Sequence, residues 1–262
     1  LPGAVRVGAM FYYRTNRDQF GQRNEAVPTS TYTAHTINIP NGPAGLTTGQ
    51  AFNLRSDLVS AQDLVRFNAD YLDTEYKGVE FTATKRFTQK WQMQAGFTIG
   101  KNEGGVTNGT DLNDPNVTLF PTGIIGNDSE TALRVSGSYE LPWQINLAGS
   151  LIANNGYPYN TTFNLTRAAA ATQGIILTRA SQTIQLTERG EERYENVVMA
   201  DLRLSRRFRF GGNRSFQPEI SIFNITNSDT VVGHTVAIGG NYLVPTEILA
   251  PRIMRVGFTL NF

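Results

Sequence analysis

The chain has 262 residues, of which 40% are hydrophobic and only 17% are charged, and its formal net charge is +1. No stretch approaches the roughly 18 consecutive apolar residues that a membrane-spanning helix needs, and the lack of cysteine excludes disulfides and thiolate metal sites. The small net charge gives no reason to expect nucleic acid as a partner. Abundant Gly, Phe and Tyr favour an all-β chain of strands and turns.

The first strand-like pattern begins at once, near residues 4–14. The chain opens Leu1-Pro2-Gly3 with no initiator Met, basic leader or apolar signal core, so we interpret it as truncated rather than as the start of a domain. A long segment, 15–69, follows. Within it Thr31 to Ile39 is rich in Thr and Ile and is expected to form a hairpin or a strand extension.

Seven further strands are predicted from alternating apolar and polar residues. Trp91, Met93, Ala95 and Phe97, for example, alternate with glutamines and a glycine, and a second Thr- and Ile-rich stretch, Ile175 to Leu186, again indicates strand extensions. The strands are expected near 70–87, 91–103, 130–141, 143–158, 196–210, 215–226 and 252–262.

The last strand has the clearest alternation. Met254, Val256, Phe258, Leu260 and Phe262 form one apolar face, and mostly polar residues form the other. Eleven residues at about 3.3 Å each, tilted near 45°, rise about 25 Å, which is the height of the apolar band of an outer-membrane barrel. Soluble strands average about five or six residues.

The apolar face of these strands is nearly free of charge. Its breaches, Lys85 and Arg206, lie beside expected turns, where a charge costs about 0 to 1 kcal/mol instead of roughly 2 to 4 at the bilayer midplane. Aromatic residues such as Trp91 and Trp143 mark the same strand ends, as an interfacial girdle requires. The pattern therefore predicts a transmembrane antiparallel β-barrel.

Loop lengths test this prediction independently. Short turns are expected at Thr88-Gln89-Lys90, Leu141-Pro142-Trp143 and 211–214, and they alternate strictly with long segments at 15–69, 104–129, 159–195 and 227–251. Outer-membrane barrels have short periplasmic turns and long extracellular loops. We therefore expect the C-terminus to be periplasmic.

The order of several motifs resembles the end of Oar-like TonB-dependent receptors. They are Asp70 to Ala83 followed by Lys85-Arg86-Phe87, Val135 to Trp143, Asp201 to Gly212, Phe223-Asn224-Ile225-Thr226-Asn227, and Arg252 to Phe262. The resemblance implies that residues 1–262 are one barrel segment, the last 8–10 strands of a 22-strand barrel in the outer membrane of a Gram-negative bacterium. It also implies an N-terminal plug, not present in this sequence, through which the inner-membrane protein TonB drives uptake.

Three groups of candidate functional residues follow from these patterns. Tyr157 and Tyr159 lie at the outer rim and are candidates for ligand contact, although rim aromatics more often pack against loops. Phe258, Leu260 and Phe262 are similar to the strand end that barrel-assembly machinery recognises, against the alternative of a plain hydrophobic strand end. The third group faces the lumen, where ion pairing and hydration are the alternative to substrate contact: Arg134, Glu140, Asp201, Arg203, Arg207, Arg209 and Glu219.

The sequence gives little support for a metal site or a catalytic site. His35 and His234 are far apart in sequence, and both are interpreted as solvated loop residues. The cluster of Asp111, Asn113, Asp114 and Asn116 offers oxygen ligands but lacks the glycine and glutamate of a calcium loop, so a turn-forming role is favoured. No serine-nucleophile motif or phosphate loop is present. We expect no enzyme activity, no cofactor and no metal.

The leading hypothesis is a receptor segment for uptake of a scarce or bulky nutrient: a chelated metal, vitamin, glycan or peptide. The alternatives are a self-contained eight-stranded outer-membrane barrel with a structural or adhesive role and a soluble secreted β-sandwich binding module. A fragment of a larger barrel predicts an open curved sheet with unpaired edges near Val5 and at the last strand. A second protein layer over Val256, Phe258 and Leu260 would instead indicate the sandwich.

Overall fold

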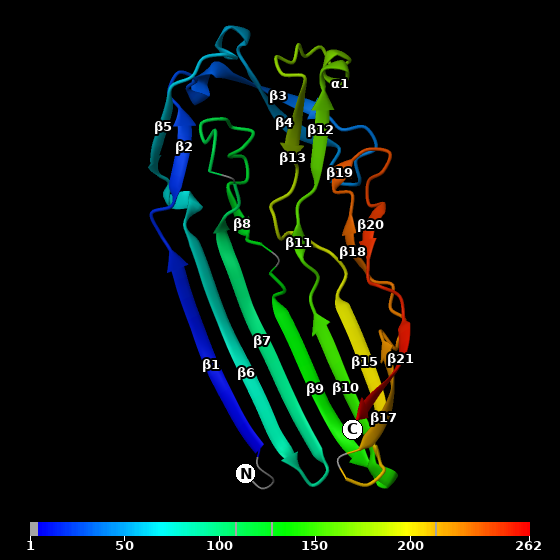
Figure 1. Ribbon diagram of the computed structural model, residues 1–262. Coiled ribbons are helices and arrows are strands. Elements are labelled where there is room, and N and C mark those ends of the chain that lie inside the picture. The colour runs from blue at the N-terminus through cyan, green and yellow to red at the C-terminus, as the bar shows by residue number, and fades with distance from the viewer. Residues whose placement is uncertain (1–4, 108, 127, 213) are drawn as a thin grey trace.

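The computed structural model describes residues 5–107, 109–126, 128–212 and 214–262. Its main sheet contains all eight predicted strands, each antiparallel to the strands that precede and follow it in this series, so the all-β prediction is confirmed (Figure 1). The strands are β1 (Val5–Asn16), β6 (Thr74–Thr88), β7 (Trp91–Gly105), β9 (Thr131–Leu141), β10 (Ile145–Asn154), β15 (Val197–Arg206), β17 (Ser215–Phe223) and β21 (Ile253–Asn261).

All three short connections lie at one end of the sheet, and the long ones lie at the other end (Figure 1). Gln89 and Lys90 join β6 to β7 with φ values of 52° and 70°, the left-handed conformation of a tight hairpin turn whose twist matches the flanking strands. Trp143 and Gln144 have φ values of 61° and 59°. Trp143 therefore lies in the turn Pro142–Gln144, in agreement with the expected turn Leu141-Pro142-Trp143, and the strand expected from 143 begins at Ile145.

Other strand boundaries also differ from the prediction. β15 ends at Arg206 and β17 at Phe223, whereas the strands were expected to reach 210 and 226. The expected strand 70–87 begins only at Thr74, because Asp70–Leu72 form a 3-10 turn that buries Leu72. The expected strand 143–158 ends at Asn154, and Pro158–Tyr159 form a separate short strand, β11.

The sheet is open. β1 pairs with β6, β21 pairs with β17, and within the described part of the chain neither outer strand has a second partner. One hollow is lined by residues from β6 through to β21, so the sheet is also curved. These observations match the open curved sheet with free edges at the first and last strands, and they differ from the closed cylinder of a self-contained eight-stranded barrel.

The long connections fold together into what we call the loop cap, the described residues of 17–73, 106–130, 155–196 and 224–252. Tyr32 to Asn38 form strand β3, as expected, whereas within Ile175 to Leu186 only Ser181–Gln185 are a strand. The 3-10 turns are Thr29–Thr31, Ser56–Leu58 and Asp70–Leu72, and the α-helix is α1 (Arg167–Ala171). The strand pairs are β2 (Phe20–Asn24) with β5 (Leu64–Asn68), β3 (Tyr32–Asn38) with β4 (Thr48–Leu54), β11 with β14 (Glu192–Arg193), β12 (Thr162–Thr166) with β13 (Ser181–Gln185) and β19 (Ala237–Ile238), and β18 (Val231–His234) with β20 (Pro245–Ile248).

The hydrophobic core lies in this cap. Every buried hydrophobic side chain among the described residues is outside the eight long strands. The larger cluster joins three segments of the cap, with Ile37 from the first, Leu165 and Ile184 from the third, and Ile238 from the fourth. A smaller one, around Leu72 and Leu112, joins the first and second segments. Short strands β8 (Thr122–Ile124) and β16 (Phe208–Arg209) extend the main sheet at its two ends.

Candidate functional site

The strand register separates the main sheet into one apolar and one polar face. Residues directly opposite each other in neighbouring strands share a face, so the pairings place apolar residues side by side across the sheet. One such row is Val7, Ala83, Ala95, Val135, Leu151 and Ala200; another is Trp91, Tyr139, Leu147, Leu204, Ile220 and Val256.

No layer from the described part of the chain covers the apolar face. Val256, Phe258 and Leu260 are 72%, 68% and 56% exposed, and Phe11 on the opposite outer strand is 69% exposed. The arrangement that would have indicated a sandwich is therefore not observed at these positions. In addition, no helix in the described part of the chain is long and apolar enough to cross a membrane.

The two charged residues that interrupt the apolar face near the turns are satisfied locally. Lys85 is buried, and its ammonium group donates to the carbonyl and hydroxyl oxygens of Thr88, both at 2.8 Å, and to the carbonyl of Trp91 at 3.0 Å. It also lies 4.0 Å from the centroid of the Trp91 ring. The guanidinium of Arg206 lies 4.7 Å from the centroid of the Phe208 ring. Both charges thus lie at the turn end of the apolar face.

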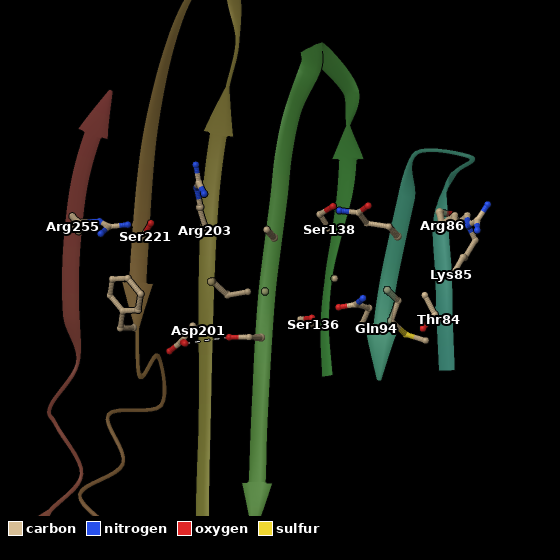
Figure 2. A pocket seen from close by; sticks show the side chains of 18 residues that line it. Thr84, Lys85, Arg86, Gln94, Ser136, Ser138, Asp201, Arg203, Ser221 and Arg255 are labelled. Carbon is tan, nitrogen blue, oxygen red and sulfur yellow. Dashed lines mark hydrogen bonds between the residues drawn. The ribbon is translucent and has the colours of Figure 1, made fainter. Parts of the chain in front are cut away.

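The opposite face is polar and concave. A hollow of about 670 Å³ on this face extends from Thr84 on β6 to Arg255 on β21. Figure 2 shows its labelled side chains on successive strands, with Ser136 and Ser138 between Gln94 and Asp201. Seven of its lining side chains are hydroxyls or amides, four are cationic and one is a carboxylate, so the hollow offers hydrogen bonds together with an excess of positive charge.

The predicted lumen residues all lie on this concave face. Asp201 is opposite Ser150, Arg203 is opposite Ser221, and Glu219 is opposite Ser205. Asp201 accepts hydrogen bonds from the Ser150 hydroxyl at 3.1 Å and from the Asn224 backbone N–H at 2.9 Å. The Asp201 carboxylate therefore stabilises the packing of β15 against neighbouring segments.

Glu219 is shared between two arginines. It forms an ion pair with Arg203, and the guanidinium of Arg255 lies 3.9 Å from its other carboxylate oxygen. The side chain of Arg134, in contrast, has no hydrogen bond or ion pair with any described residue and remains available on the concave face. Within the predicted set, Arg203 and Glu219 are therefore engaged in ion pairs, whereas Arg134 is not.

A second hollow, of about 570 Å³, lies toward the short turns and is lined by Glu140, Arg203, Arg207 and Arg209. Arg207 donates to the side-chain oxygen of Gln217 at 3.0 Å. The structure therefore brings Arg203 into both hollows and places Arg134 in neither, because Arg134 lines a separate depression beside Ser136.

Of the residues that line the larger hollow, the predicted lumen set contains only Asp201 and Arg203. Arg255 and Ser221 are two that it lacks. Arg255 belongs to the polar set of the last strand, so the alternation with Met254 and Val256 was a sufficient signal. Ser221 is 3% exposed, and its hydroxyl has no hydrogen-bond partner among the described residues. No local signal distinguishes Ser221 from other serines, because its burial depends on the neighbouring strands.

The two rim tyrosines have different surroundings. Tyr157 is 40% exposed, whereas Tyr159 packs between strands of the cap, with ring centroids 4.8 Å from Tyr194 and 4.6 Å from His234. Burial, followed by the nearby Glu192 carboxylate, raises the pKa of Tyr159 to about 12. His234 was expected to be solvated, but it lies in β18 inside this aromatic cluster, with a buried Nδ1.

The oxygen-rich loop cluster is occupied by structural hydrogen bonds. Asn113 bonds the backbone of Asn24 through both its side-chain oxygen and nitrogen, and Asn116 does the same with Phe52. Asp114 is buried and pairs with Arg179 at 2.9 Å. His35 lies in β3. The described residues contain no group of three or more His, Asp or Glu side chains arranged to hold a metal.

No family model and no curated protein matches the chain. Among solved structures it is similar to the ferripyoverdine receptor of the outer membrane of Pseudomonas aeruginosa, with 11% identity, a TM-score of 0.48, and coverage of 98% of this chain and 25% of that one. It is also similar to the outer membrane transporter YddB from Escherichia coli (14% identity, TM-score 0.48, 98% and 30% covered) and to the copper transporter OprC (11%, 0.46, 98% and 29%). The chain thus spans less than a third of the length of these proteins.

Proposed function

We propose that this chain forms the last strands of an outer-membrane receptor barrel that takes up a scarce or bulky nutrient in a TonB-dependent manner. The observation that carries the proposal is the continuous apolar face of eight long strands, which is exposed in the middle of the sheet and at both edges. Such a face is unfavourable in water, because exposed apolar area costs about 25 cal/mol per Å². It is favourable against lipid hydrocarbon.

The height of the apolar face supports a membrane as its environment. On β6 the outward positions between Lys77 and Lys85 are Val79, Phe81 and Ala83. Eight residues span about 26 Å along a strand and about 19 Å of depth at a 45° tilt, close to the roughly 25 Å apolar band of such barrels. Both lysines would then lie near the two interfaces, where charge is tolerated.

The orientation follows from the asymmetry of the connections. We place the short turns and the C-terminus in the periplasm of a Gram-negative bacterium and the loop cap outside the cell. Phe258, Leu260 and Phe262, which is 98% exposed, then form the strand end offered to the barrel-assembly machinery. Deleting Phe262 should reduce membrane assembly, and unaltered assembly would remove this part of the proposal.

The concave face would meet what occupies the lumen. In the Oar-like arrangement that is a plug domain supplied by the rest of the protein, and TonB would act through it. Arg134, Glu140, Arg207 and Arg209 are the residues we propose to contact the plug or the passing ligand, because no charged partner engages them among the described residues. Direct binding and transport, and no catalysis, are what this face supports.

The two alternatives fit the geometry less well. A self-contained eight-stranded barrel needs β1 paired with β21, and a secreted sandwich needs a second layer over the apolar face. Neither arrangement is present in the described part of the chain.

Membrane fractionation of the expressed protein tests the proposal. We expect it to sediment with outer membranes and to remain there after washing with carbonate, whereas partition into buffer without detergent would overturn the membrane assignment. Protease added to intact cells should cut the loop cap near Val59 and spare the turn at Gln89. Cleavage at Gln89 with protection of the cap would reverse the proposed orientation.

A further inference from the structure

A third hollow, of about 440 Å³, lies where the concave face meets the loop cap. Its lining comes from Tyr12 and Arg14 on β1, Tyr76 on β6, Asn102 on β7 and Asp128 in the cap. A volume of this size is typical of small-molecule sites. None of these residues was selected from the sequence.

Tyr76 lines this hollow, and the hydroxyl end of its ring lies against the sheet. A Cβ atom added at Gly78 would be 2.4 Å from the Tyr76 hydroxyl, and one added at Gly100 would be 2.8 Å from it. The ring therefore covers both glycines, which are paired with each other across β6 and β7. An aromatic side chain held over two glycines in this way offers its ring to the hollow as an apolar surface, which we call the platform.

Polar groups surround this platform. Arg14 and Asn102 are the two cross-strand neighbours of Tyr76, and neither side chain has a hydrogen bond or ion pair with any described residue. Asp128 uses one carboxylate oxygen to accept the Asn102 backbone N–H at 2.9 Å. A guanidinium, a carboxamide and a carboxylate oxygen are therefore left to bind a ligand. Their charges balance, so the site does not favour a strongly anionic ligand.

The rim of the hollow is anchored by two arginines of the cap. Arg193 donates to the carbonyl of Asp128 at 2.6 Å, and Arg189 donates to the carbonyl of Gly126 at 2.9 Å. On the other wall, the hydroxyl of Tyr12 donates to Glu80 at 2.8 Å. These contacts hold the Asp128 and Tyr12 walls of the hollow in place before a ligand arrives, which lowers the entropic cost of binding.

We propose that this hollow binds one sugar ring of a glycan. A pyranose has an apolar C–H face that stacks on a phenol ring and equatorial hydroxyls that bond planar groups such as those of Arg14, Asn102 and Asp128. The inference deepens the proposed function by naming the nutrient class, and it rests on that function for its location outside the cell.

Binding to the protein purified in detergent tests this directly. The probes are soluble hexasaccharides of glucose, xylose and galactose, and an iron complex of dihydroxybenzoate as the competing chelate class. We expect saturable binding of at least one hexasaccharide, measured by calorimetry. Failure of all three to bind, or displacement of a bound hexasaccharide by the iron complex, would overturn the proposal.

Variants locate the site. Arg14→Gln changes an exposed side chain and Asn102→Ala a half-buried one, and neither side chain has a hydrogen-bond partner in the described chain. Each variant should weaken binding about tenfold, as expected for lost hydrogen bonds. Tyr76→Leu should weaken it at least as much, whereas Tyr76→Phe keeps the platform and should bind nearly normally. Tyr139→Leu, on the apolar face, is the matched control. Unchanged binding in Arg14→Gln and Asn102→Ala would move the site elsewhere.

This measurement does not depend on membrane insertion. Sugar binding without outer-membrane fractionation would contradict the proposed function and leave the site intact. Outer-membrane fractionation without sugar binding would support the proposed function and contradict the sugar site.

Discussion

The main sheet and the loop cap distribute their apolar residues in opposite ways. In the cap, Leu165 and Ile184 are 0% and 1% exposed, whereas in the sheet Phe11 and Val256 are 69% and 72% exposed. Both regions are built of antiparallel strands. The difference is therefore in what lies against the apolar side: other protein segments in the cap, and nothing from the described chain in the sheet. Burial within the chain measures hydrophobic stabilisation only when water is the solvent.

Substitution in the cap core should have the largest effect. Leu165→Ala removes a fully buried side chain and should destabilise the cap by about 2 to 5 kcal/mol, because a cavity is added to the lost transfer energy. Hydrogen exchange should rise in 17–73 and 155–196 with little change in β9 and β10. Leu204→Ala in the sheet is the control, and equal loosening of the cap by both variants would break the comparison.

A charge on the apolar face should cost nearly as much. Val135→Arg places a guanidinium near the middle of the proposed apolar band and should lower the free energy of unfolding in bilayers by about 2 to 4 kcal/mol. Ser136→Arg, the next residue and on the concave face, should change it by less than about 1 kcal/mol. Denaturant titration of the protein in lipid vesicles measures both. Similar costs for the two variants would mean that lipid does not face Val135.

Alkaline pH should loosen the cap before the sheet. Burial is the main cause that raises the pKa values of Tyr32 and Tyr159 to about 12, while an unfolded tyrosine titrates near 10. The folded state therefore holds these protons more tightly, so its stability is full below pH 10 and declines as pH rises from 10 to 12. Near-ultraviolet circular dichroism should change in that window. The double variant Tyr32→Phe with Tyr159→Phe should shift the change to higher pH.

The smallest effect is expected at a turn. Lys90 has a φ of 70°, which glycine adopts without steric cost, so Lys90→Gly should stabilise the protein by about 0.5 to 1 kcal/mol. The carbonyl that accepts the Glu140 N–H at 2.7 Å is retained. Gln92→Gly, in the extended backbone of β7, should destabilise by a similar amount. A loss of stability in Lys90→Gly, measured in the same denaturant titration, would contradict the left-handed turn.

The sequence predicts the sheet well because its signal is local. Alternation over ten or more residues fixes which side chains share a face, so the positions of Asp201, Arg203 and Glu219 on one face followed from spacing alone. The strand ends were less accurate. Trp143 continues the alternating pattern in sequence, but the turn at Pro142 takes it out of the strand.

The cap and the third hollow could not be predicted in the same way. Thr162 pairs in parallel with Ala237, and His234 packs between Tyr159 and Tyr194. These contacts join segments that are distant in sequence, so the periodicity of one segment does not predict them. The platform at Tyr76 likewise depends on Gly100 from the neighbouring strand. Its sequence signal, a tyrosine two residues before a glycine, has no meaning until the register of β6 and β7 is known.

The interlocking of the cap has a consequence for recognition by antibodies or phage. Asn38 and Gln173 bond each other through two hydrogen bonds although 135 residues separate them, and Asp114 pairs with Arg179 from another segment. An epitope on this surface is therefore discontinuous. A synthetic peptide copied from one loop would lack the neighbours that give the loop its shape, so only the assembled protein would elicit antibodies that bind it.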